Sequence, residues 1–266
     1  MATTELMAGG QAGAFPTNET RYVGIAGALV LIQAAEISHR VIARSAYTLA
    51  NLFVRVIANA TSGGDSTVRS RVNGGNGNLV VTIGGTTGVF EDTTNTDSLA
   101  VADLVVTQVV TAPVGALTCS IIGYTLNQAF DDTILATTCK TSDGTCGINT
   151  PNSYLPICGG WYAVATESFQ QYTFRVASTL SNLRVICVGA PAVTAVTVRT
   201  RINGANGAQV VTVLSSGIYE DTTNTDAVAV GDEVNYYFNQ VGGAGAGTYS
   251  LVQLKSLARG RQVGVS

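Results

Sequence analysis

The chain contains a long internal repeat, and this repeat limits its fold more than any other feature. Residues 67–83 read TVRSRVNGGNGNLVVTI, and residues 197–213 read TVRTRINGANGAQVVTV. A second matched pair follows, with GVFEDTTNTDSLAVAD at 88–103 and GIYEDTTNTDAVAVGD at 217–232. Two long copies without a third predict the internal duplication of a self-sufficient domain, because solenoid repeats are shorter and need several neighbours to bury a core.

The first segment of each copy has the alternation of a half-buried β-strand. Apolar or small side chains occupy every second position, and polar side chains lie between them. The polar set holds two arginines in each copy: Arg69 and Arg71, then Arg199 and Arg201. We expect these arginines to lie on a solvent face or to contact a neighbouring domain, and a binding site is the alternative.

Turn signals follow these segments. Asn73-Gly74 and Asn76-Gly77, with the matching dipeptides of the second copy, supply the positive φ angles that tight hairpins require. The sequence EDTTNTD is rich in side chains that bond to nearby backbone, which predicts a folded loop. Its carboxylates are also candidate calcium ligands, although no EF-hand spacing is present. These carboxylates are Glu91, Asp92, Asp97, Glu220, Asp221 and Asp226.

Short segments with frequent turns and no sustained helical periodicity predict an all-β chain. About eight strands per repeat favour a jelly roll over an immunoglobulin-like sandwich, whose cysteine and tryptophan spacing is missing. We therefore predict two tandem antiparallel β-sandwich, jelly-roll-like domains. The expected divisions are a flexible N-terminal arm at 1–20, a first sandwich at 21–127, a linker at 128–152, a second sandwich at 153–258 and a C-terminal tail at 259–266.

Few residues suit catalysis. His39 is the one histidine, so a Ser-His-Asp or Cys-His arrangement would have to use it, and Gln170 stands in its place in the second copy. Glu91 and Asp92 are adjacent in a strand and would point to opposite faces, so they could not flank one bond. We expect a structural or surface role for His39, no enzymatic activity, no cofactor and no metal.

The five cysteines do not form a zinc-binding pattern. Cys119 and Cys187 lie in apolar segments and are expected to be buried. A disulfide between Cys139 and Cys146 would form only if the protein leaves a reducing compartment. The cysteines therefore predict no zinc site and leave the disulfide open.

The charged fraction is 12% and the net charge is −3, and these values exclude some partners. A chain without a basic stripe is not expected to bind nucleic acid directly. No apolar stretch is long enough for a spanning helix, and the first twenty residues lack the features of a secretion signal, so we expect cytoplasmic synthesis and no membrane contact. Charge-poor surfaces suit burial against other protein.

The TVRxRxNGxNGxxVVT segment and the GxxEDTTNT and VAxGD sequences after it resemble the jelly-roll repeats of tailed-bacteriophage virion proteins, including head decoration and fibre proteins. The resemblance implies a virion structural protein that is added to a particle, with copies of itself and other virion proteins as partners. We expect assembly contacts at Phe15, Arg69, Arg71, Arg199 and Arg201. The lack of a coiled-coil or collagen-like shaft argues against a long fibre.

Two other function classes are compatible with the sequence. A carbohydrate-binding module would use exposed aromatic side chains, for which Tyr162, Tyr236 and Tyr237 are the candidates. A self-assembling extracellular filament subunit would use residues 1–20 to complete the sheet of a neighbouring subunit by strand addition.

Overall fold

The structure is a computed structural model of the whole chain, and two compact units divide it, Met1–Phe130 and Asp131–Val263. It describes residues 2–9, 13–28, 32, 34–128, 132–137, 146–148, 152–158, 164–189, 195–240 and 247–258. Over these residues the chain is all-β, apart from the short 3-10 helices η1 (Glu36–His39) and η2 (Glu167–Phe169). In this part of the chain no helix has the length and apolar character needed to span a membrane.

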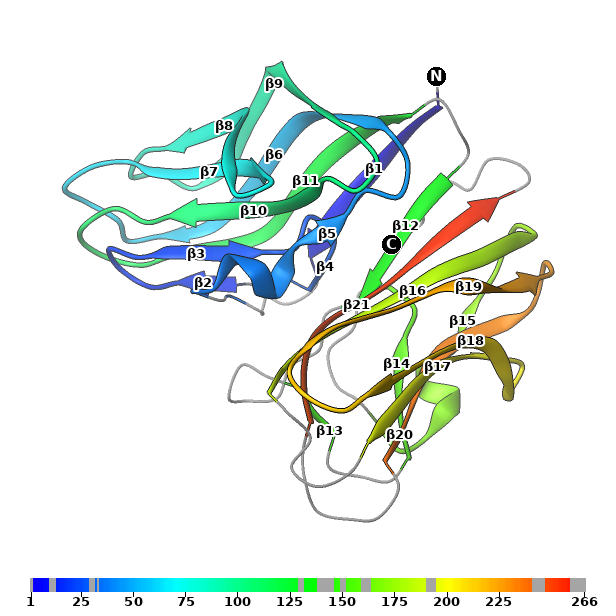
Figure 1. Cartoon of the computed structure of the whole chain (residues 1–266). Helices are drawn as coiled ribbons and strands as arrows, with labels where there is room; N and C mark the ends of the chain where they lie inside the picture. The colour runs from blue at the N-terminus through cyan, green and yellow to red at the C-terminus, as the bar shows by residue number, and fades with distance from the viewer. Residues whose placement is uncertain are drawn as a thin grey trace. The chain divides into compact units, whose positions relative to one another are not determined.

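Two sheets build the first unit (Figure 1). One has the order β4-β1-β11-β6-β9, and β2 also pairs with β11; the other has the order β3-β10-β7-β8, and β5 also pairs with β10. The pairs are antiparallel except for β1 with β4. The bounds are β1 (Ala2–Gly9), β2 (Gly13–Phe15), β3 (Thr20–Val23), β4 (Gly27–Ala28), β5 (Val41–Ile42), β6 (Tyr47–Asn59), β7 (Ser66–Val72), β8 (Gly75–Ile83), β9 (Gly88–Leu99), β10 (Leu104–Val110) and β11 (Leu117–Gln128).

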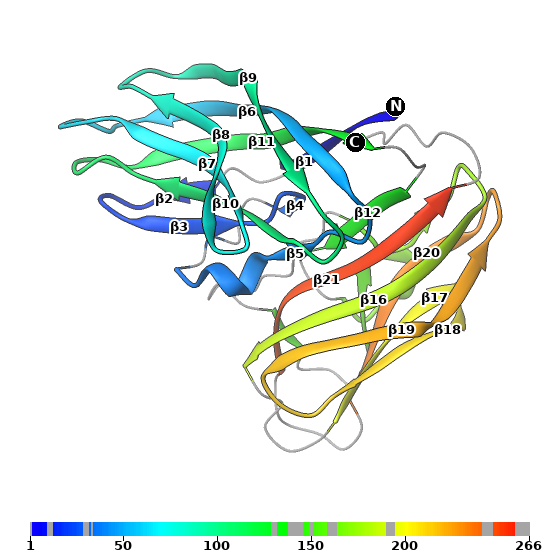
Figure 2. The same cartoon turned by 45° about the horizontal axis from the view of Figure 1, so that its top comes forward.

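The second unit has the same plan. One sheet has the order β12-β21-β16-β19 with β13 beside β21, and the other has the order β14-β20-β17-β18 with β15 beside β20 (Figure 2). The bounds are β12 (Asp132–Thr137), β13 (Cys146–Ile148), β14 (Asn152–Pro156), β15 (Tyr172–Thr173), β16 (Ser178–Gly189), β17 (Val196–Ile202), β18 (Ala205–Val213), β19 (Gly217–Val228), β20 (Glu233–Gln240) and β21 (Gly247–Ala258).

The strand order is that of a jelly roll in both units. When the eight long strands of a unit are numbered along the chain, one sheet runs 1-8-3-6 and the other runs 2-7-4-5. In the first unit these strands are β1, β3 and β6 to β11; in the second they are β12, β14 and β16 to β21. The predicted all-β, jelly-roll-like sandwich architecture is therefore confirmed, while its origin by duplication stays an interpretation of the repeat.

Alternating burial explains why these segments form sandwiches. Along β7, Val68 and Ser70 are buried while Arg69 and Arg71 are only partly buried, and β17 repeats the pattern. The inward side chains of both sheets of the second unit meet in one apolar core that includes Val198, Leu183 and Phe238. The predicted alternation is confirmed, and it gives each unit a core of its own.

The Asn-Gly dipeptides differ in their roles. Asn73 and Gly74 have φ values of 51° and 83° and form the tight β7–β8 hairpin, as the sequence predicts, and Asn203 and Gly204 do the same between β17 and β18. Asn76-Gly77, in contrast, lies within β8. The prediction of a second turn there is wrong, because Gly77 lies where buried side chains approach the backbone too closely for any other residue.

The structure also corrects the expected boundaries. Most of the arm expected at residues 1–20 belongs to the first unit, because β1 pairs along β11 and β2 continues the same sheet. The linker expected at 128–152 contains β12 and β13, which both pair with β21 of the second unit. These strands pair with segments that are far away in the sequence, so local composition did not reveal them. The tail at 259–266 lies outside the described residues.

Candidate interaction surface

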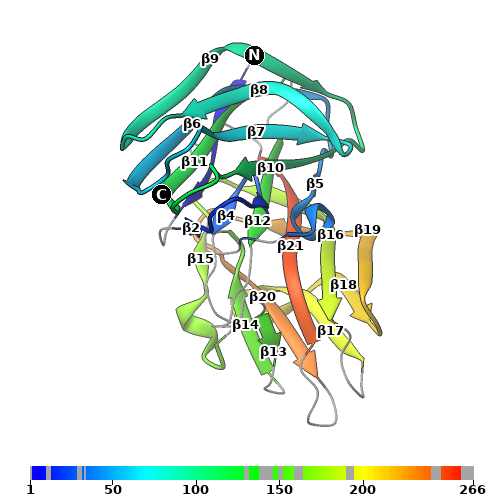
Figure 3. The same cartoon turned by 90° about the vertical axis from the view of Figure 1, so that its left-hand side faces the viewer.

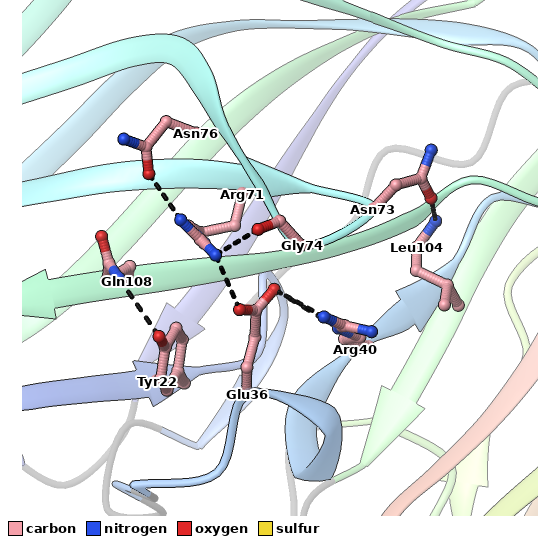
Figure 4. Close-up of polar contacts among 9 residues, drawn as sticks. All are labelled: Tyr22, Glu36, Arg40, Arg71, Asn73, Gly74, Asn76, Leu104 and Gln108. Carbon is pink, nitrogen blue, oxygen red and sulfur yellow. Dashed lines mark hydrogen bonds and ion pairs between the residues drawn. The ribbon is translucent and has the colours of Figure 1, made fainter.

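A polar cluster on the outer face of the β3-β10-β7-β8 sheet fixes helix η1 to the first unit. Arg71 on β7 donates to the carboxylate of Glu36 on η1, with Nη2 and Oε2 3.0 Å apart (Figure 4). Arg71 also donates to Asn76 Oδ1 and to the carbonyl of Gly74 in the hairpin. Arg40 binds the other oxygen of Glu36 at 3.0 Å. One carboxylate therefore joins the helix, the strand and the hairpin.

The second unit repeats this cluster and adds two tyrosines. Arg201 binds both oxygens of Glu167 on η2 at 2.9 Å, and it also donates to Asn206 and to the carbonyl of Gly204. Tyr154 and Tyr237 stack beside it with ring centroids 5.1 Å apart. The guanidinium carbon of Arg201 lies 5.2 Å from the centroid of Tyr237, which is within range of a cation–π interaction.

Electrostatics keeps this second cluster charged. The hydrogen bonds that Arg201 donates to Glu167 raise the pKa of Arg201, and they outweigh the partial burial that opposes its charge. Partial burial and the nearby Glu167 carboxylate raise the pKa of Tyr154, so its hydroxyl stays neutral. The cluster is therefore an Arg201–Glu167 ion pair beside two stacked tyrosine rings.

The two arginines on β7 differ in their contacts, and so do the two on β17. Arg71 and Arg201 are bound within their own units, and their side chains are only 16% and 17% exposed. Arg69 and Arg199 lie on the same outer faces, partly exposed, and within the described part of the chain neither has a recorded ion pair or hydrogen bond. Phe15 is fully buried in the first unit, so its side chain has no exposed surface for another subunit.

The acidic segments are not loops. Residues 91–97 and 220–226 lie within β9 and β19, which corrects the predicted folded loop. Asp92 is buried and accepts from the backbone N–H groups of Val80, Thr94 and Asn95 at 2.9 to 3.1 Å, while Glu91 is exposed. The adjacent carboxylates therefore point to opposite faces, as predicted.

A second buried aspartate in each unit completes a bridge between the two sheets. Asp97 on β9 accepts from the backbone N–H of Asn78 on β8 at 2.7 Å and from the hydroxyl of Ser70 on β7. Asp226 makes the same contacts with Ala208 and Thr200 in the second unit. Among the described residues, no group of three or more His, Cys, Asp or Glu side chains gathers in a geometry for a metal ion.

This bridge explains why a glycine is required at position 77, which the sequence alone did not explain. A Cβ atom on Gly77 would lie 2.2 Å from Ser70 Oγ and 2.6 Å from Asp97 Oδ2. Gly207 has the same surroundings, with Thr200 Oγ1 at 2.3 Å and Asp226 Oδ2 at 2.8 Å. The second Asn-Gly dipeptide of each copy thus marks a close approach of side chains to the backbone.

The remaining candidates are structural or lie outside the described residues. His39 is fully buried on η1, and its Nδ1 lies 2.8 Å from the carbonyl of Ser38. Cys119 and Cys187 are buried and are not in disulfides, and burial raises the pKa of Cys119 to about 12. Cys139 falls outside the described residues, so the Cys139–Cys146 disulfide stays a prediction.

The tyrosines proposed for carbohydrate binding have different fates. Tyr236 is fully buried and donates weakly to the carbonyl of Ile157, so it cannot serve as a stacking surface. Tyr237 is partly exposed, while Tyr162 lies outside the described residues. Tyr154, which the sequence did not single out, is the partner of Tyr237; only its pairing across β14 and β20 reveals it.

Comparison of this chain with protein-family models and with curated proteins finds no match.

Proposed function

We propose that this chain is a structural assembly protein of a virus particle, a capsid decoration or minor capsid protein that acts through protein–protein contacts. Two jelly rolls with firmly braced outer faces suit that role, because a rigid surface loses little conformational entropy when it binds. The low charged fraction of 12% favours burial of these faces against other protein.

One observation carries the proposal. Among the described residues of each unit, one arginine on this outer face, Arg69 or Arg199, has no recorded ion pair or hydrogen bond, while the arginine two residues further along is held by a glutamate. Arginine is enriched in protein interfaces, where its planar guanidinium pairs with carboxylates. A chain that offers the same group twice can contact two neighbours in the same way.

Two measurements test this function. Antibodies against the purified chain should label virus particles in electron micrographs of the material from which the sequence comes. Replacement of both arginines, Arg69→Glu with Arg199→Glu, should weaken binding to those particles at least tenfold. The control Arg175→Glu changes an exposed arginine in the turn that follows β15, and it should leave this binding unchanged. Particles without label, together with a chain that stays monomeric at high concentration, would contradict the proposal.

The stacked tyrosines keep carbohydrate binding as a second candidate. Tyr154, Tyr237 and Arg201 place aromatic and hydrogen-bonding groups together on one face. Glycan-array binding that is lost in Tyr154→Ala and in Tyr237→Ala would favour this function, if it is kept in Tyr22→Ala. Tyr22 lies on β3 of the first unit, which corresponds to the strand β14 that carries Tyr154. The filament alternative depends on residues 1–20 entering a neighbour's sheet, whereas here β1 completes the sheet of its own unit.

A further inference from the structure

Strands β11, β6 and β9 lie side by side in one sheet of the first unit (Figure 2). Their outer face carries apolar side chains and two charged side chains. Ile121, Arg55 and Val89 lie opposite one another on the three strands, and Gly123, Phe53 and Glu91 form the next row. Val89 is 54% exposed and Ile57, further along β6, is 47% exposed. Exposed apolar side chains grouped on one face indicate a contact surface.

The two charges on this face are close neighbours but do not pair. Arg55 and Glu91 are exposed, and within the described residues neither has a recorded ion pair or hydrogen bond. In the second unit the position of Phe53 is taken by Arg184, which lies opposite Glu220 and binds it at 3.1 Å. In the first unit Phe53 lies opposite Glu91 instead, and the arginine of this face, Arg55, lies one row along the sheet, opposite Val89.

We propose that this face binds the same face of a second copy of the chain, so that Arg55 of each copy pairs with Glu91 of the other. An interface between identical surfaces must be self-complementary, and a face with one cation and one anion beside exposed apolar side chains meets that condition. The apolar side chains around the two charges add buried area, and the two ion pairs fix the orientation of the contact. This inference rests on the proposed assembly function and names its first partner.

Charge reversal tests the pairing. The full-length chain should show a concentration-dependent dimer in sedimentation velocity, and the dimer should weaken as salt rises. Arg55→Glu and Glu91→Arg each place like charges together twice in a symmetric dimer, so each should raise the dimer Kd by about tenfold or more. The double variant R55E/E91R restores opposite charges and should return the Kd to within about threefold of the original.

A control and an apolar variant complete the test. Glu233→Arg changes an exposed charge in the second unit and should leave the Kd unchanged, whereas Val89→Asp should abolish the dimer. Circular dichroism would confirm that each variant is folded. The proposal would be overturned if the single reversals have no effect or if the double variant does not recover. It would also be overturned if the wild-type chain is monomeric at about 100 μM, which is about 100 times a Kd of 1 μM.

Particle binding separates this inference from the proposed function. If the reversed variants still label virus particles while the dimer is unaffected, the function stands and this face is not the contact. If the wild-type chain dimerises through this face but never labels particles, the dimer stands and the virion role fails.

Discussion

At the scale of single residues, the sharpest constraint is the lack of space at Gly77. An added methyl group would have to displace Ser70 and Asp97, which are both buried and bonded to each other. We expect Gly77→Ala and Gly207→Ala each to lower the free energy of unfolding by about 2 to 3 kcal/mol, in the range of overpacked cores. Urea unfolding measures this, with Gly84→Ala as the control, since its nearest neighbour would be 3.7 Å away. Equal stability of all three variants would contradict the bridge.

The buried carboxylates make stability depend on pH. Burial disfavours the charge on Asp92 and Asp221, but hydrogen bonds from Val80 or Val210 and from Asn95 or Asn224 outweigh it and hold each pKa below its ordinary value. A carboxylate with a lowered folded pKa stabilises the protein above the unfolded pKa of about 3.9, and this contribution is lost as the pH falls through the folded value.

Substitution of these aspartates should therefore change both the level and the slope of stability. Asp92→Asn with Asp221→Asn should lower the free energy of unfolding at pH 7 by at least about 2 kcal/mol, the order of a hydrogen bond to a charged group. The variant should also lose less stability than wild type between about pH 4 and pH 2. Urea titrations at several pH values would show this, and Asp65→Asn, which is exposed, is the matched control.

At the scale of elements, the Glu–Arg contacts decide whether η1 and η2 stay on their sheets. Neither helix has a side-chain cap, and each has at most four residues, so tertiary contacts must hold it. Glu36→Gln should increase hydrogen exchange of residues 35–42 at least severalfold while leaving β6 to β8 protected. Glu167→Gln should do the same for residues 166–173. Unchanged exchange in both variants would show that the apolar contacts suffice.

The elements also show what the sequence could predict. The alternation in 67–72 and the dipeptide Asn73-Gly74 act over a few residues, so β7, its hairpin and β8 were predictable (Figure 3). Strands β1 and β12 depend on long-range pairing with β11 and β21, and the sequence was interpreted there as an arm and a linker. The loop predicted for EDTTNTD was wrong as an element, because residues 91–97 lie within β9. Asp92 does bond to the nearby N–H groups of Thr94 and Asn95, but Asp92 and Asp97 also bond to strand β8, which the sequence did not reveal.

The candidate surface was predictable only in part. The arginines of the repeat were found from their spacing, but which of them is bound depends on Glu36 and Glu167, more than thirty residues away. The stacking of Tyr154 on Tyr237 depends on the pairing of β14 with β20. Such contacts between distant segments need the fold before they can be recognised.

At the scale of the whole molecule, each unit has its own complete pair of sheets. The apolar core of the second unit comprises side chains from residues 155 to 254. We expect a fragment of residues 131–266 to fold alone, with a β-rich circular dichroism spectrum and a cooperative thermal transition. A fragment starting at residue 153, which lacks β12 and β13, is the control and should be less stable or unfolded. If both fragments behave alike, those two strands are dispensable.

The aspartates of β9 and β19 have a consequence for crowding. Strands β8 and β18 lie at the edges of their sheets, where free N–H groups could recruit an extended segment of another protein and start amyloid growth. Asp92 and Asp97 take up the N–H groups of Asn78 and Val80, and the second unit repeats this. The aspartates therefore protect these two edges against strand addition when copies of the chain lie side by side at high concentration.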